Sequence, residues 1–324
     1  MRSKKEIVAF CVMVMAILGS FFMQGCTKED NTHCGIVVHF KYDKNVYFVD
    51  RFSNALSRME LHIFDANNNF LRTETRESEG AFFTSDFEIK MIDLQPGTYT
   101  LVAWGNRSST LSQSTLLREG PTNFDNATLT LNAEGGTSPR TESMTLFHSC
   151  IQKLVVQDGV EGTQEVLMDL TKFTNHIVVT AKGLPVTIDD TDPPFHCFIT
   201  SANGSYKFDG DYANDDVITY NPLFNIPTNN TIVSDFTILR EVNANLTDSK
   251  MFVTKTVGDD TQILVEIDLV DMLVNIAGDT LNSLNTGELD RDDEFRINLE
   301  FDMVGATVTV YINQWKTEVR PVPL

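Results

Sequence analysis

Hydrophobic and polar residues alternate along much of the chain from residue 35 onward. In the first such segment Ile36, Val38 and Phe40 share one face, while His39 and Lys41 share the other. A period of two is typical of a half-buried strand. The same pattern, or a short apolar run bounded by turn residues, predicts further strands at residues 59–63, 82–91, 97–104, 127–131, 144–148, 153–156, 167–170, 176–181, 196–201, 232–240, 251–256, 261–268, 295–301 and 308–312.

Turn residues separate these segments and organise them into two halves. Asp65 with the asparagines at 67–69, and Pro96-Gly97, mark turns because Asp, Asn and Gly accept turn geometries and Pro presets one. Helical spacing appears at residues 269–276, a short helix that Gly278 would end. We therefore predict an all-β protein with two tandem β-sandwich domains, at residues 35–150 and 151–324, and a short helix in the second. The boundary is expected near residues 149–152.

The N-terminus has the layout of an export signal. Basic residues at positions 2, 4 and 5 precede an apolar run from Ile7 to Met23, and Gly25 stands directly before Cys26. This arrangement resembles a bacterial lipobox, which implies cleavage between Gly25 and Cys26 and acylation of the cysteine. Residues 1–25 are then the signal peptide and residues 26–34 a polar tether. The alternative is an ordinary transmembrane anchor, for which the apolar run is short.

Composition excludes some classes of function. Hydrophobic residues make up 42% of the chain, enough for packed cores, and the formal net charge is −20. An acidic chain without a basic stripe is a poor partner for nucleic acid. Once Cys11 leaves with the signal and Cys26 is acylated, Cys34, Cys150 and Cys197 remain, which allows at most one disulfide or buried free thiols.

No motif of catalysis or of cofactor binding is found, so the chain is not expected to be an enzyme, to need a cofactor or to hold a metal. Acidic loops at residues 189–192 and 209–216 lack the spacing of a calcium loop, and solvated loops are the simpler interpretation. Nothing singles out a pair of carboxylates for a glycosidase. Asp279-Thr280-Leu281 resembles an acceptor site for bacterial O-glycosylation, which makes Thr280 a candidate for modification; a helix cap is the alternative.

Several segments together resemble the FimB/Mfa-type fimbrial anchor lipoproteins of the type V pilus of Bacteroidetes-type bacteria. The resemblance is carried by Cys26 with its preceding residues and by the segments at 61–65, 97–106, 146–148 and 312–315. Residues Ser149-Cys150 and Gln314 depart from the family's pattern, in which glycine is expected. Lys28, Glu29 and Asp30 resemble the signal that sends such lipoproteins to the outer surface of the outer membrane.

This resemblance implies transthyretin-like sandwiches and a role at the base of a fimbrium. The chain would hold the fimbrium at the cell outer membrane through its acyl chains, limit the fimbrium's length and join stalk or accessory subunits by strand addition. The strand from Thr307 through Val308, Thr309, Val310 and Tyr311 to Ile312 is the candidate for that joint; the alternative is a closing strand of its own sandwich. A different function would be a surface lipoprotein that binds glycans through exposed aromatics such as Trp104 or Trp315.

Overall fold

The protein is built almost entirely from strands, which confirms the predicted all-β class. The structure is a computed structural model of the chain and describes residues 35–109, 111–113, 122–138, 144–157, 163–189, 193–213, 216–240, 249–270, 291–312 and 315–322. Besides strands it contains a one-turn helix, α2 (Phe52–Ala55), and a 3-10 turn, η1 (Phe124–Asn126). The helix expected at residues 269–276 lies largely outside the described residues.

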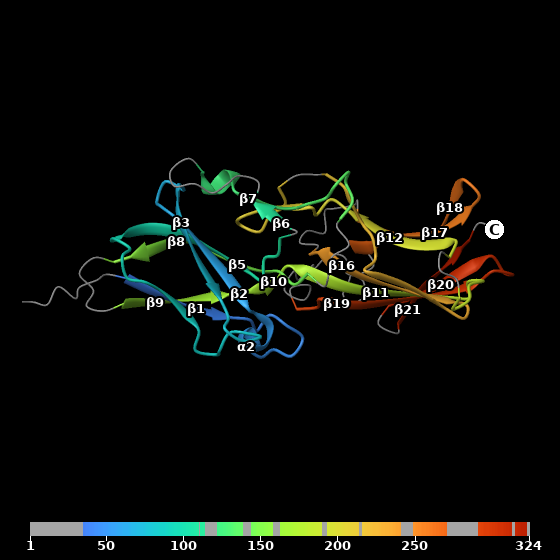
Figure 1. Cartoon of the computed structure of the whole chain (residues 1–324), viewed down its shortest axis with the longest axis horizontal. Coiled ribbons are helices and arrows are strands. Elements are labelled where there is room, and N and C mark those ends of the chain that lie inside the picture. Colours follow the sequence, from blue (N-terminus) through green and yellow to red (C-terminus); the bar gives the residue numbers. More distant parts are fainter. Residues whose placement is uncertain are drawn as a thin grey trace, which may run out of the picture.

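A three-stranded and a five-stranded sheet pack face to face in the N-terminal half, which we call the first sandwich (Figure 1). Their strand orders are β4-β1-β9 and β10-β8-β5-β2-β3. Alternate residues of β1, β2 and β5, such as Ile36, Leu61 and Leu101, meet in one buried cluster, as the period of two requires. The bounds are β1 (Gly35–Lys41), β2 (Arg58–Phe64), β3 (Phe70–Glu77), β4 (Glu88–Met91), β5 (Gly97–Gly105), β8 (Phe147–Val156), β9 (Thr163–Asp169) and β10 (Thr171–Lys172).

The C-terminal half forms the second sandwich, from a six-stranded sheet β15-β16-β11-β19-β20-β21 and a four-stranded sheet β14-β12-β17-β18. Ile177, Ile297 and Val310 of the larger sheet share a core cluster with Ile199 and Val253 of the smaller one. The bounds are β11 (Thr174–Lys182), β12 (Phe195–Ser201), β14 (Ile218–Tyr220), β15 (Phe224–Thr228), β16 (Thr231–Leu239), β17 (Lys250–Val257), β18 (Asp260–Asp268), β19 (Glu294–Asp302), β20 (Thr307–Ile312) and β21 (Trp315–Pro321).

A small sheet ties the two sandwiches together. It has the order β13-β7-β6, with β6 (Leu111–Gln113) and β7 (Thr128–Leu131) from the N-terminal half and β13 (Ser205–Lys207) from the C-terminal half. Beneath it, Trp104 of β5 is fully buried and contacts Phe173 edge-on, and Phe173 in turn contacts Tyr206 of β13. The core of the second sandwich therefore extends without a break onto the outer face of the β2–β5 sheet.

The chain passes from the first sandwich to the second later than the boundary expected at residues 149–152. That boundary falls inside β8, which is one continuous strand paired with β5. This strand joins the end of the predicted segment at 144–148 to the whole of the segment at 153–156. After β8 the chain stays in the first sandwich, because β9 pairs in parallel with β1 and β10 pairs with β8. Only from Thr174 onward does the chain join the sheets of the second sandwich.

The strand that follows the turn at residues 65–69 was missed by the hydrophobic pattern. This strand is β3, whose polar sequence FLRTETRE carries little hydrophobic alternation, whereas the predicted strand at residues 82–91 is reduced to β4. β3 is the edge of its sheet and its alternate side chains are exposed or half-buried. A strand with one unpaired edge and a solvated face carries only a weak hydrophobic signal.

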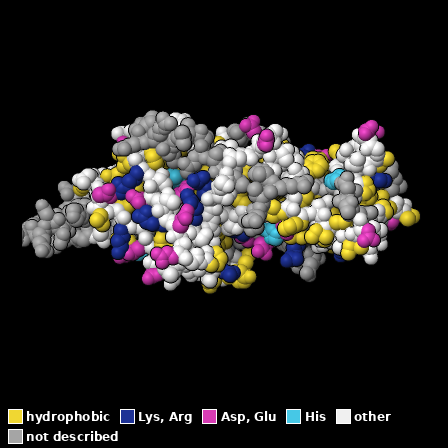
Figure 2. All heavy atoms as spheres, viewed as in Figure 1, with side chains coloured by type: hydrophobic (Ala, Val, Ile, Leu, Met, Phe, Trp, Pro, Cys, Tyr) yellow, Lys and Arg dark blue, Asp and Glu magenta, His cyan; other side chains and the backbone are white. Residues whose placement is uncertain are grey.

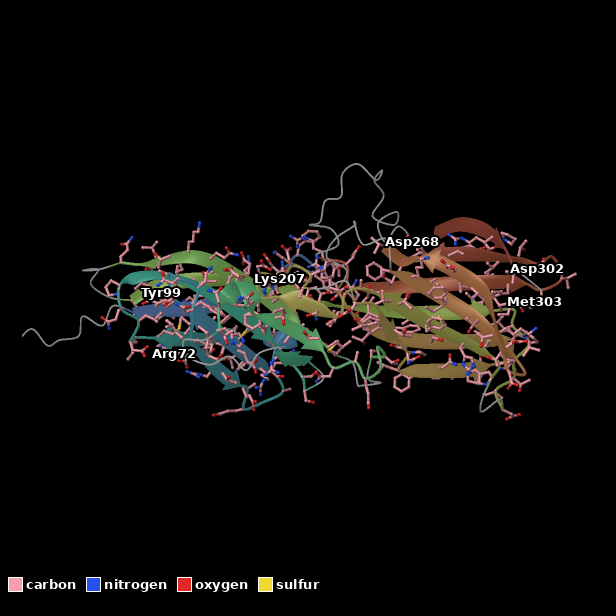
Figure 3. All side chains as sticks on the ribbon, turned by 90° about the horizontal axis from the view of Figure 1, so that it is seen from above. Arg72, Tyr99, Lys207, Asp268, Asp302 and Met303 are labelled. Atoms are coloured by element: carbon pink, nitrogen blue, oxygen red, sulfur yellow. The ribbon has the colours of Figure 1, made fainter. Side chains whose placement is uncertain are left out.

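The two sandwiches lie end to end in an elongated molecule. Gly35 begins β1 at the end of the first sandwich that faces away from the second, and the C-terminus lies toward the opposite end (Figure 1). Seen from above, Tyr99 and Arg72 lie in the first sandwich, while Asp302 and Met303 lie at the tip of the second (Figure 3). On the face shown in Figure 2, basic and acidic side chains intermingle over the first sandwich. Within the described residues no helix is long and apolar enough to cross a membrane.

Candidate functional site: the C-terminal sheet edge and the junction cavity

Half of the predicted site residues lie outside the part of the chain that the structure describes. Gly25, Cys26, Lys28, Glu29, Asp30 and Thr280 lie outside the described residues. The described chain begins at Gly35, so a group attached shortly before that residue would be held near the start of β1.

The predicted partner strand, β20, is an inner strand of its sheet. It pairs with β19 on one side, from Ile297↔Ile312 to Asp302↔Thr307, and with β21 on the other, from Thr307↔Pro321 to Ile312↔Trp315. In the chain by itself β20 is thus a closing strand of its own sandwich, the alternative that the alternating pattern left open. A role for Thr307–Ile312 in a joint stays a prediction, and it requires β21 to move or to receive the partner itself.

Two strands form the edges of the six-stranded sheet, β21 and β15. β21 is linked to the edge of the other sheet, since the Arg320 guanidinium donates to the Glu266 carbonyl of β18. β15 is short and contains Pro227, a residue that discourages strand addition, although its Phe224 and Ile226 are exposed. The edge at β14 is covered by the loop at residues 134–138, because Ser138 N donates to the Thr219 carbonyl.

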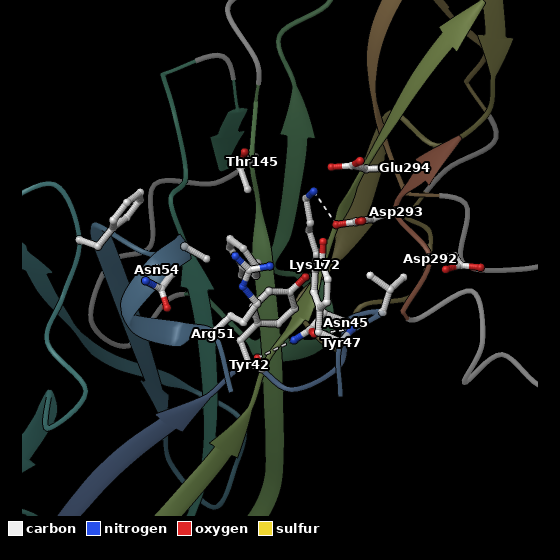
Figure 4. Close-up of a pocket in the computed structure, with 14 residues that line it drawn as sticks. Tyr42, Asn45, Tyr47, Arg51, Asn54, Thr145, Lys172, Asp292, Asp293 and Glu294 are labelled. Carbon is white, nitrogen blue, oxygen red and sulfur yellow. Dashed lines mark hydrogen bonds and ion pairs between the residues drawn. The ribbon is translucent and has the colours of Figure 1, made fainter. Parts of the chain in front are cut away.

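A cavity of about 430 Å³ opens where the two sandwiches meet (Figure 4). We call it the junction cavity. The aromatic rings of Tyr42 and Phe147 meet edge to face, with 4.8 Å between the ring centres. Lys172 forms an ion pair with Asp293, with 2.5 Å between Nζ and Oδ2. Asn54 and Arg51 lie on one side and the acidic residues 292–294 on the other. The lining residues are Tyr42, Asn45, Val46, Tyr47, Arg51, Asn54, Ala55, Phe82, Thr145, Phe147, Lys172, Asp292, Asp293 and Glu294.

Residues 45–49, which we call the aromatic loop, lie beside this cavity, and the first three of them line it. Val46, Tyr47, Phe48 and Val49 are 48%, 64%, 69% and 54% exposed. A run of four exposed apolar residues is unusual for a soluble surface without a partner. Sequence reasoning missed this site, although the apolar run directly after a charged turn was a signal that could have found it.

The electrostatic field inside the cavity is set mainly by its acidic side. Tyr42 is only 6% exposed, and its pKa is raised well above the ordinary value by burial first, and then by the negative charge of Asp293, with Glu294 adding to it. Arg51 opposes this effect but does not reverse it. At the Tyr42 hydroxyl the effect of Asp293 and Glu294 therefore outweighs that of Arg51.

Other candidate chemistry is not assembled. Trp104 is fully buried and so is not available as a glycan platform. Among the described residues no group of three or more His, Cys, Asp or Glu side chains could hold a metal ion. Cys150 and Cys197 are free thiols, and burial raises the pKa of the Cys150 thiol to about 12, which keeps it protonated and unreactive.

The strand pairing defines an all-β protein of two packed sandwiches, and comparison with known proteins identifies its family. The family model described as "Fimbrillin-A associated anchor proteins Mfa1 and Mfa2" matches residues 29–320. The chain therefore belongs to this family of structural fimbrial anchor proteins of the cell surface.

Individual relatives are distant. The minor fimbrium anchoring subunit Mfa2 of Porphyromonas gingivalis is 21% identical over 235 residues, which is 70% of this chain and 69% of the relative. The solved structure of the fimbrial anchor protein Mfa2 from the same organism has a TM-score of 0.71 at 20% identity, covering 87% of this chain and 98% of that one. A putative polysaccharide binding protein from Bacteroides thetaiotaomicron has a TM-score of 0.72 at 21% identity, covering 89% and 98%. At these identities the structural matches establish a shared fold.

Proposed function

We propose that this chain is the lipid-anchored base subunit of a fimbrium. Signal cleavage after Gly25 leaves Cys26 as the first residue, and its acyl chains insert into the outer membrane. Lys28, Glu29 and Asp30 direct the lipoprotein to the outer face of that membrane. The protein then joins a neighbouring fimbrial subunit and limits the length of the fibre, because a subunit tethered at one end is a terminus of the polymer.

The observation that carries this proposal is the polarity of the molecule. The described chain starts at one end of an elongated body, and the C-terminal strands β20 and β21 run toward the other end (Figure 1). A lipid attached before Gly35 would hold the first sandwich at the membrane and present the second sandwich outward. Such an arrangement separates the membrane contact from the subunit contact.

For the joint itself we propose strand addition at the C-terminal side of the six-stranded sheet. An added strand gains affinity from backbone hydrogen bonds and specificity from alternate side chains. β21 pairs only with β20 among the described strands, so a partner strand either extends the sheet at β21 or replaces β21 beside Thr307–Ile312. Thr280 is proposed as a glycosylated residue of the same exposed subunit.

The anchor is tested with Cys26→Ala. We expect most fimbriae to move from the cell surface into the culture medium, because the acyl chains that retain the base subunit are missing. The matched control is Cys34→Ala, which removes a thiol from the same tether region and should leave fimbriae on the cells. Retention of fimbriae on Cys26→Ala cells with this protein still at the surface would refute the proposed anchor.

A further inference from the structure

The aromatic loop is held in one conformation although its side chains are exposed. The Asn45 amide donates to the carbonyl oxygens of Tyr42, at 3.0 Å, and of Val49, at 2.8 Å, and its Oδ1 accepts from Tyr47 N at 3.0 Å. Phe48 has a φ of +55°, a left-handed conformation that an aromatic residue rarely adopts. Specific hydrogen bonds therefore hold the loop in a conformation that leaves its apolar side chains in solvent.

The second sandwich helps to hold this loop. The Arg291 guanidinium lies 4.4 Å from the centre of the Phe48 ring and donates to the Asp43 carbonyl at 2.8 Å. On the cavity side the Arg51 guanidinium lies 4.8 Å from the centre of the Tyr47 ring. A surface fixed in this way binds with a smaller loss of conformational entropy, and Tyr and Arg are enriched among residues that dominate protein interfaces.

Some polar groups of the adjoining cavity are left to be satisfied by a ligand. The Tyr42 hydroxyl, on a residue more than nine-tenths buried, has no hydrogen-bond partner among the described residues, and its ring points toward Lys172 and Asp293 (Figure 4). The exposed Glu294 carboxylate forms no ion pair within the described chain. Lys172 is already paired with Asp293, so the acidic side retains the excess of charge.

From these features we infer that the junction cavity and the aromatic loop form a docking site for a segment of a partner protein that inserts a Lys or Arg side chain. The apolar stem of that side chain would pack against Tyr47 and Phe82, and its cationic head would reach Glu294 and the Tyr42 hydroxyl. An anionic segment would face the acidic residues 292–294 unfavourably. The same acidic side argues against the anionic surface of a membrane.

The identity of the partner as a fimbrial subunit rests on the proposed function. This docking site is separate from the C-terminal sheet edge, because it lies where the two sandwiches meet rather than at β20 and β21 (Figure 1). A neighbouring subunit that contacts both places would be held by the strand joint and oriented by the junction.

The test uses the full-length lipoprotein in detergent micelles and two probes: fimbriae purified from a strain that lacks this chain, and a fluorescent alanine-lysine peptide. Glu294→Gln should weaken binding of both probes by roughly three- to tenfold, the range of a partly exposed charge pair. Glu300→Gln, on the outer face of the same strand β19, is the control and should bind as the parent does.

The changes in binding affinity of these variants decide whether the ligand is a basic side chain. If Glu294→Gln binds the peptide as tightly as the parent, or if Glu300→Gln weakens binding as much as Glu294→Gln does, the inference of a basic side chain is overturned. Tyr42→Phe keeps the ring packing and removes only the hydroxyl, so unchanged binding by that variant also counts against the site. If the peptide binds with the expected pattern but fimbriae do not, the docking site stands and the fimbrial partner, with the proposed function, fails.

Discussion

The protonation state of two buried histidines depends on the core that surrounds them. His148 lies 4.4 Å from Trp104 and 4.8 Å from Phe173, ring centre to ring centre, and its Nε2 donates to the Phe208 carbonyl at 3.0 Å. His62 is 1% exposed on β2 and hydrogen bonds with Thr73 at 2.7 Å. Burial is the main cause that lowers the pKa of each imidazole to about 4. Both rings are therefore neutral in the folded protein at pH 7.

We predict that the free energy of unfolding falls as the pH drops from about 6.5 toward 4. The unfolded chain binds protons on these histidines near pH 6.5, whereas the folded chain binds them only near 4, so stability present above 6.5 is lost in between. The slope is about 1.4 kcal/mol per pH unit for each histidine. Urea unfolding of the parent and His148→Gln at pH 7.0 and 5.0 measures it, and His148→Gln should lose clearly less stability between the two values.

The exposed His196 on β12 provides the comparison for that measurement. His196→Gln should show the same loss between pH 7.0 and 5.0 as the parent chain. The lowered pKa values of Asp43 and Glu60, which are hydrogen bonded to Lys41 and to Arg107 with Arg58, affect stability mainly below this window. A parent chain equally stable at both pH values would contradict the assignment to histidine.

At the level of elements, position within a sheet decides what a strand can do. β20 has the regular alternation of an interface strand, but its edges are occupied by β19 and β21. β21 forms the edge, and a register shift between Val310 and Tyr311 interrupts its pairing with β20. Irregular pairing lowers the cost of displacing an edge strand or of extending the sheet beside it.

Deleting residues 306–324 should abolish attachment of fimbriae while much of the fold remains. The deletion removes both β20 and β21, so the partner strand loses the edge that it would extend and also the strand beside which it would replace β21. Attachment is measured as cell-bound fimbriae, and folding as far-UV circular dichroism. Ile226→Lys, on the opposite edge strand β15, should retain attachment. A folded deletion variant that still holds fimbriae would show that the joint lies elsewhere.

On the scale of the whole molecule, the continuous core makes the two sandwiches one mechanical body. Phe64 and Trp104 from the first sandwich belong to the same buried cluster as Phe173 and Phe208. Across the junction, Lys172 pairs with Asp293 and Arg291 bonds to the Asp43 carbonyl. For a fimbrial anchor, such a body would transmit a pulling force along its length without bending at the middle.

We predict that the two sandwiches unfold together. In a Trp315→Phe background the fluorescence of Trp104 reports on the shared core, while far-UV circular dichroism reports on all strands. The two signals should give coincident urea transitions, because loss of either sandwich exposes the apolar surface that stabilises the other. Two separate transitions would show that the sandwiches are energetically independent.

The sequence by itself determined the elements whose side chains alternate between core and solvent. β1, β5, β11 and β19 were located from this pattern, because alternation depends only on the strand's own period and on one buried face. The fimbrial anchor family was also recognised from ordered motifs, and the family match confirms it.

The tertiary structure alone decided which strands are neighbours. The return of β9 to pair with β1, the closing position of β20 and the meeting of residues 42–55 with residues 292–294 all join segments far apart in sequence. A local pattern cannot specify such partners, since they are selected by the packing of the whole chain. For the same reason the junction cavity has no continuous motif: its walls come from five separate stretches that only the fold brings together.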